Sequence, residues 1–232
     1  MKGLAIAASL ALSTSVWAAD TVQERLTEAT KVFTEIMGTP DKGIPQDLLS
    51  KAECVIVIPN MKQAAFIVGG EYGKGFATCR DTARTGWTGP AALEINGGSV
   101  GFQIGGSSTD LIMLVMNREG MKKLTGDKFT LGADATVAAG PVGRSAAAQT
   151  NVRMDAQILA WSRAKGAFAG VALTGASVRP DKSDNRALYG KDVTNVDILS
   201  GTVPAPANVN SLALAINKFA AAGSTSADRS KQ

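Results

Sequence analysis

The acidic side chains are the first residues of this chain to consider for chemistry, because its 232 residues include no histidine. The absence of histidine excludes Ser-His and Cys-His nucleophile pairs and His-ligated metal sites. The carboxylates Glu71, Glu94 and Asp110 lie in segments with strand-like sequence. Two carboxylates in one cleft could act as acid and base, but nothing in this spacing brings two together. We therefore predict no catalytic residues, no metal ligands, no cofactor and no enzymatic activity.

Two further motifs resemble ligand sites. Residues 69–75 (Gly-Gly-Glu-Tyr-Gly-Lys-Gly) look like a phosphate-binding loop, but Gly75 follows Lys74 where such a loop needs Ser or Thr. A hairpin turn between two strands is the better interpretation. Asp181 and Asp184 could suggest calcium, but their segment lacks the alternating ligands and central glycine of an EF-hand loop. We expect a solvated turn or a helix cap there.

Cys54 and Cys79 are the two cysteines of the sequence. In an oxidising compartment two cysteines most often pair. A disulfide closing this loop would stabilise the fold by about 3 kcal/mol in the chain-entropy model. The alternative is two buried, unpaired thiols, and we favour the bond. A redox role is not expected, because the spacing is far from C-x-x-C.

The N-terminus has the three parts of a secretory signal peptide. Lys2 supplies the positive charge, residues 4–16 are apolar or small, and a small-residue cleavage site ends at Ala18. The apolar run is shorter than the roughly 20 residues that a membrane-spanning helix needs. We predict a signal peptide at residues 1–18 and a periplasmic or secreted protein, with peripheral association with a membrane as a further option. The net charge of +4 is mildly basic and does not indicate nucleic-acid binding.

The predicted elements point to one domain, residues 19–222, of the α+β class. An N-terminal helix is expected at 20–37, because Thr21 and Glu24 form a capping box. Its apolar residues share one helical face, and its polar face has mixed charge, so packing on the core is favoured over a membrane. A C-terminal helix is expected at 208–222 and a disordered tail at 223–232. The apolar face of the first helix consists of Val22, Leu26, Ala29, Phe33 and Ile36.

Between the two helices, short apolar runs alternate with glycine-rich turns. This pattern predicts a β-dominated fold, in which a curled antiparallel sheet, barrel- or sandwich-like, is flanked by the N- and C-terminal helices. Frequent glycine inside the strands fits a strongly bent sheet. The predicted strands are 54–58, 64–68, 75–79, 91–95, 99–104, 110–116, 129–139, 145–152, 157–162 and 168–178.

Over roughly residues 44–190, the sequence resembles the SYLF domain family. The stretch Gly-Gly-Ser-Val-Gly-Phe-Gln-Ile-Gly at 97–105 carries the resemblance most clearly. Other motifs follow in the family's order at 109–115, 130–132, 138–144, 161–166, 168–170, 180–181, 185 and 189–190. The resemblance implies a non-catalytic module that binds lipid, since eukaryotic SYLF proteins bind phosphoinositides and some bind actin. In that family, membrane binding is attributed to an amphipathic N-terminal helix and a basic surface.

Three basic residues fall within those motifs, and two more form a local cluster outside them. Arginine binds phosphate bidentately and lysine as a point charge, so we predict that they bind anionic, phosphoinositide-like head groups at a membrane surface. Actin is not expected as a partner of an exported chain. The alternative is a structural or protein-interaction module of the cell envelope, with a protein partner and no lipid. The predicted head-group residues are Arg144, Arg163, Lys165, Lys122 and Lys123.

Overall fold

The computed structural model describes residues 20–39, 43–66, 68–99, 105–142, 156–164, 167–171 and 173–229. The predicted signal peptide at 1–18 lies outside these residues, as do Arg144, Lys165 and the predicted strand at 145–152.

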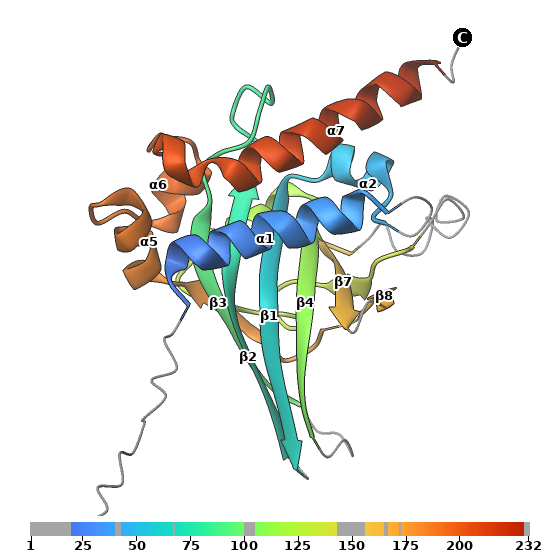
Figure 1. The fold of residues 1–232 in the computed structure, drawn as a ribbon, viewed down its shortest axis with the longest axis vertical. Coiled ribbons are helices and arrows are strands. Elements are labelled where there is room, and N and C mark those ends of the chain that lie inside the picture. The colour runs from blue at the N-terminus through green and yellow to red at the C-terminus, as the bar shows by residue number, and fades with distance from the viewer. Residues whose placement is uncertain are drawn as a thin grey trace, which may run out of the picture.

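A curled sheet forms the centre of the molecule, with helices packed on it and at its end (Figure 1). Within the described residues the strands run in the order β5-β9-β3-β2-β1-β4-β7-β6, and β8 pairs with β7. This half-barrel confirms the predicted α+β class. The strands are β1 (Cys54–Phe66), β2 (Val68–Cys79), β3 (Ala91–Ser99), β4 (Gly105–Val115), β5 (Phe129–Thr130), β6 (Val137–Ala139), β7 (Ile158–Ala164), β8 (Ala167–Gly170) and β9 (Ser177–Pro180).

The sheet is antiparallel except where β6 runs parallel to β7. The prediction of one strand at 129–139 was wrong, because Gly132 turns the chain at φ 84° and divides the segment into β5 and β6. The predicted strand at 168–178 is likewise divided into β8 and β9, with Gly175 at φ 88° between them. Glycine adopts such positive φ values without the steric cost that a side chain would bring.

β1 runs past the end of the predicted strand at 54–58 and continues through Pro59 and Asn60. The pairing of β1 with β2 shifts register between Val57 and Lys62, and Asn60 has φ 52°. This bulge accommodates a proline without an N–H and an asparagine in the left-handed region. The backbone N–H of Asn60 donates to Asp110 on β4 at 3.0 Å, which holds the bulge in place.

The hairpin turn predicted at 69–75 is also wrong, because these residues lie within β2. Two of their glycines, Gly73 and Gly75, face the bulged part of β1. A Cβ at Gly75 would lie 2.1 Å from the carbonyl oxygen of Val57, and one at Gly73 would lie 2.7 Å from the side chain of Ile58. These two glycines therefore permit close approach of two strands.

Helix α1 (Val22–Met37) has the predicted capping box and buries the predicted face against the sheet and α7 (Ser211–Arg229). The rings of Phe33 and Phe219 meet edge to face, 6.0 Å apart. α7 extends past the predicted end at Ala222, where alanines favour helix. None of the described helices is long and apolar enough to cross a membrane. The other helices are α2 (Gln46–Lys51), α3 (Arg118–Leu124), α5 (Lys182–Tyr189) and α6 (Asn195–Leu199), with a 3₁₀ turn at Ala207–Val209.

Cys54 and Cys79 form a disulfide, as predicted. They are directly opposite each other on β1 and β2, and both are fully buried. The bond therefore joins the two central strands at the end where α2 leads into β1.

Candidate functional site

The predicted head-group residues that the structure describes lie on two separate elements, one a strand and the other a helix. Arg163 on β7 is paired in register with Asp110 of β4, whereas Lys122 and Lys123 lie on α3, which follows the end of β4 at Val115. Five residues of strand separate Asp110 from Val115, which is about 17 Å at ~3.4 Å per residue. The structure therefore does not bring Arg163 together with the two lysines.

Arg163 is held between two carboxylates. Its Nε donates to Asp110 at 2.9 Å, Nη2 pairs with the same carboxylate at 2.8 Å, and Nη1 donates to Glu35 of α1 at 2.7 Å. Burial acts to lower the pKa of Arg163, but the hydrogen bonds and charges of Glu35 and Asp110 outweigh it and raise that pKa. In this arrangement Arg163 joins the C-terminal part of α1 to the sheet.

The short helix α3 and the turn after it present four exposed cations, which we call the α3 patch. The sequence prediction included Lys122 and Lys123 and missed Arg118 and Lys128, although all four fall within eleven consecutive residues. The same stretch contains two acids, Glu119 and Asp127. Within the described chain, none of the four cations forms an ion pair. Their donors are therefore available to a ligand.

α3 is anchored firmly to the end of β4. The side chain of Asn117 caps the helix by accepting from the N–H of Gly120 at 2.9 Å. A Cβ at Gly120 would lie 2.7 Å from the side chain of Val115, so the helix rests directly on the strand end. Leu124 is buried and Met121 packs against the core. The patch is consequently presented on a fixed element.

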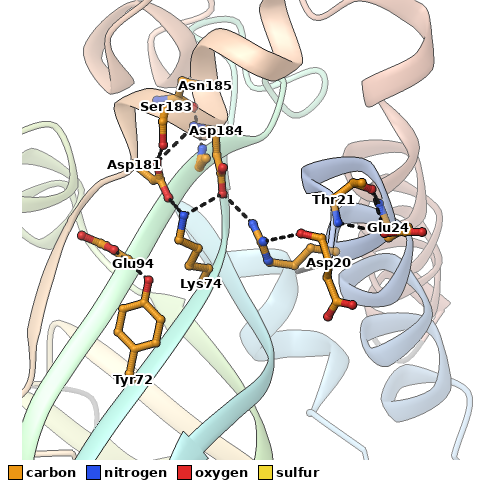
Figure 2. Close-up of polar contacts among 12 residues, drawn as sticks. Asp20, Thr21, Glu24, Tyr72, Lys74, Glu94, Asp181, Ser183, Asp184 and Asn185 are labelled. Carbon is orange, nitrogen blue, oxygen red and sulfur yellow. Dashed lines mark hydrogen bonds and ion pairs between the residues drawn. The ribbon is translucent and has the colours of Figure 1, made fainter. Parts of the chain in front are cut away.

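A second cluster of charges joins α1, β2 and α5 (Figure 2). Lys74 of β2 pairs with Asp181 at 2.5 Å and with Asp184 at 3.4 Å, and Asp184 also pairs with Arg25 of α1 at 2.5 Å. Asp181 caps α5 by accepting from the N–H of Asp184 and the hydroxyl of Ser183. This confirms a helix cap, but the side chain of Asp181 is only 6% exposed and is not part of a solvated turn.

Burial and hydrogen bonding act in opposite directions on the pKa of Asp181. Burial acts to raise the pKa of Asp181, but hydrogen bonds from Lys74, Ser183 and the Asp184 backbone, with the charge of Lys74, hold that pKa at about 2. The lysine that resembled part of a phosphate loop is thus already paired with two carboxylates of its own chain.

Buried polar residues of the SYLF-like motifs support the fold. Asn185 is fully buried; its side chain accepts from the N–H of Ala92 at 2.7 Å and donates to Asn195 at 2.6 Å. The hydroxyl of Tyr189 donates to the carbonyl of Pro90 at 3.2 Å, and burial raises the pKa of Tyr189. These contacts fix α5 and α6 against β3.

Glycines of two other SYLF-like motifs pack in succession, Gly140 against the indole of Trp161 and Gly170 against the backbone of Gly140. Trp161 is fully buried and donates from Nε1 to the carbonyl of Pro141 at 3.0 Å. A Cβ at Gly140 would lie 2.0 Å from the Trp161 ring, and one at Gly170 would lie 2.1 Å from the carbonyl oxygen of Gly140. Only glycine permits this approach, so these motif residues are explained by packing.

The three carboxylates considered for catalysis each have different partners. Glu94 accepts from the hydroxyl of Tyr72 at 3.1 Å and from Arg179, and Asp110 is bound by Arg163. Burial raises the pKa of Glu71, which a hydrogen bond from Gln63 partly opposes. Within the described residues, no group of three or more acids or cysteines could hold a metal ion.

Comparison with known proteins gives consistent matches. Residues 96–219 match the family described as Ysc84, Las17-binding protein actin regulator. SH3 domain-containing YSC84-like protein 1 of Rattus norvegicus is 34% identical over 190 residues, which cover 81% of this chain and 55% of that protein. LAS seventeen-binding protein 3 of Saccharomyces cerevisiae is 34% identical over 175 residues, which cover 74% of this chain and 38% of that protein. The chain thus spans about half the length of the first of these relatives, and less of the second.

Proposed function

The chain belongs to the Ysc84 (SYLF) family, and we propose that it is a non-catalytic module that binds anionic phospholipid head groups at a membrane surface through the α3 patch. The observation that carries the proposal is the patch itself: Arg118, Lys122, Lys123 and Lys128 are exposed, lie close together in sequence and form no ion pair with a described residue. We further propose that binding takes place outside the cytoplasm, on envelope lipids, as the predicted signal peptide implies.

The patch is better suited to an anionic bilayer than α1 is. Leu26, Ala29, Phe33 and Ile36, on the apolar face of α1, are buried in the core. The rest of that helix carries three acids and two cations, which is not the basic face that anionic lipids favour. A docked α1 therefore leaves the α3 patch as the better contact for head groups.

The expected affinity is modest. Each Lys or Arg near an anionic surface contributes about 1 kcal/mol, and the attraction falls off within a Debye length of about 8–10 Å. Four cations on one short element thus support reversible binding that salt weakens. Such binding needs no buried pocket and no bound ion.

Co-sedimentation with vesicles of phosphatidylglycerol or cardiolipin tests the proposal. Lys122→Glu/Lys123→Glu removes two attractive charges and adds two repulsive ones, so the partition coefficient should fall at least about 30-fold, equivalent to 2 kcal/mol. Lys51→Glu/Lys218→Glu is the matched control, because it makes the same charge change on exposed residues of α2 and α7. Equal loss in both variants would mean that net charge, and not this patch, determines binding.

A protein-interaction module is the second candidate, favoured by the family description, which names a protein-binding actin regulator. In that case the chain would ignore anionic vesicles and would retain a protein partner when the α3 patch is reversed. Cell fractionation and sequencing of the mature N-terminus test the proposed export, which predicts a periplasmic or secreted chain that begins after Ala18.

A further inference from the structure

A trough of about 510 Å³ lies where the C-terminal end of α1 meets β7 and β8. Its volume is within the range of about 300–1,000 Å³ that is typical of small-molecule sites. Apolar side chains form most of its walls, and one cation lies among them. The lining consists of Ile36, Val142, Ala167 and Phe168 with Glu35, Thr39 and Arg163.

The cation of the trough has one fixed and one exchangeable partner. Asp110 is 14% exposed and binds Arg163 through two nitrogens, whereas Glu35 is 47% exposed and accepts from Nη1 alone. A carboxylate whose side chain can rotate into the solvent is easier to displace from Arg163 than one that is held inside the sheet. Replacing Glu35 by another anion would also leave the charge beside Arg163 unchanged.

We propose that this trough binds one long-chain amphipathic anion. Its carboxylate or phosphate takes the place of Glu35 on Arg163, and its alkyl chain lies against Ile36, Val142 and Phe168. A free fatty acid and a phospholipid share this chemistry. This inference depends on the proposed function only for the class of ligand, an anionic lipid. It does not depend on the α3 patch, because the trough and the patch share no residue.

Two properties of the ligand follow from the lining. Burying alkyl chain should increase affinity by about threefold to fourfold per methylene until the apolar walls end. The head group must be anionic, because the trough offers a guanidinium whose present partner is a carboxylate. Glu35 competes with the ligand, so neutralising it should tighten binding.

The test uses the full chain and a dansyl-labelled fatty acid, displaced by decanoate, decyl phosphate or decyltrimethylammonium below their micellar concentrations. Decanoate and decyl phosphate should displace the probe, and the cation should not. Glu35→Gln should tighten decanoate binding by up to about fivefold, the upper end of the range for an exposed ion pair. Phe168→Ser should weaken it and flatten its dependence on chain length. Dihexanoyl phosphatidylglycerol, used as the competitor in place of decanoate, distinguishes a site for a phospholipid from a site for a free fatty acid.

Lys122→Glu/Lys123→Glu separates this inference from the proposed function, because it should leave decanoate binding unchanged while vesicle binding is lost. Arg163→Gln should weaken decanoate more than tenfold. If Arg163→Gln does not fold, Glu35→Gln still tests the inference, because it keeps the ion pair of Arg163 with Asp110. The inference is overturned if decanoate displaces no probe from the native chain or from Glu35→Gln, or if the cation displaces it equally well.

Discussion

Replacing Lys74 by methionine should destabilise the fold in a pH-dependent way. The substitution keeps an unbranched side chain but leaves Asp181, which is 6% exposed, and Asp184 without their shared cation. Removing one partner of a fully buried pair costs about 3–5 kcal/mol. Since Lys74 is 27% exposed, we expect the lower end of this range, about 3 kcal/mol near neutral pH.

The pKa of Asp181 sets the pH window. Its folded value of about 2 lies below its unfolded value of 3.8, so its stabilisation is complete above the unfolded value and is lost as pH falls through the folded value. This shift corresponds to about 2 kcal/mol. Without Lys74, burial dominates and that pKa rises, so acid destabilises the variant less. The difference between the two proteins should shrink by about 1–2 kcal/mol between about pH 6 and pH 2.5.

Urea unfolding followed by circular dichroism, at several pH values, measures both effects. Lys191→Met is the matched control, because Lys191 is exposed and forms no ion pair with a described residue; it should change stability by less than about 0.5 kcal/mol. In Lys74→Met/Asp181→Asn the buried charge is gone, so part of the loss should be recovered. The reasoning is refuted if Lys74→Met behaves like Lys191→Met, or if its stability deficit is the same at all pH values.

Three further substitutions test the packing of the family motifs and of the central strands. Gly140→Ala should cost about 3 kcal/mol in the free energy of unfolding, because its Cβ would lie 2.0 Å from the ring of Trp161. Asn185→Ala should cost about 2–3 kcal/mol, since it leaves a buried backbone N–H without an acceptor. Replacing Cys54 and Cys79 by alanine should lower stability by about 3 kcal/mol. Chemical denaturation checks all three, and a change below 1 kcal/mol in any of them would contradict the contact described for it.

Local sequence signals predicted the features that depend on neighbouring residues. The capping box of Thr21 and Glu24 and the apolar face that follows it placed α1 correctly, because a helix end and a helix face are defined within a few turns. The disulfide was also predicted, since the sequence offers one pairing of Cys54 with Cys79. The regular alternation of short apolar runs and glycines predicted the curled sheet.

The interpretations that failed depended on distant contacts. Residues 69–75 contain enough glycine for a turn, but Gly73 and Gly75 among them face the bulge of β1, which no local pattern reveals. The two carboxylate partners of Arg163 could not be predicted either, because Glu35 and Asp110 are 128 and 53 residues away in sequence. Arg118 and Lys128 of the α3 patch lie outside the family motifs. Counting basic residues in successive stretches of the sequence would have found them beside Lys122 and Lys123.

A salt titration of vesicle binding tests the central claim most directly. The fraction of native chain bound to phosphatidylglycerol vesicles is measured from about 0.05 to 0.5 M salt, beside that of Lys122→Glu/Lys123→Glu. If the α3 patch holds the domain at an anionic surface, the native chain binds at low salt and is released as salt rises, and the variant is unbound throughout. Binding that salt does not weaken, or a variant that follows the native curve, would contradict the account.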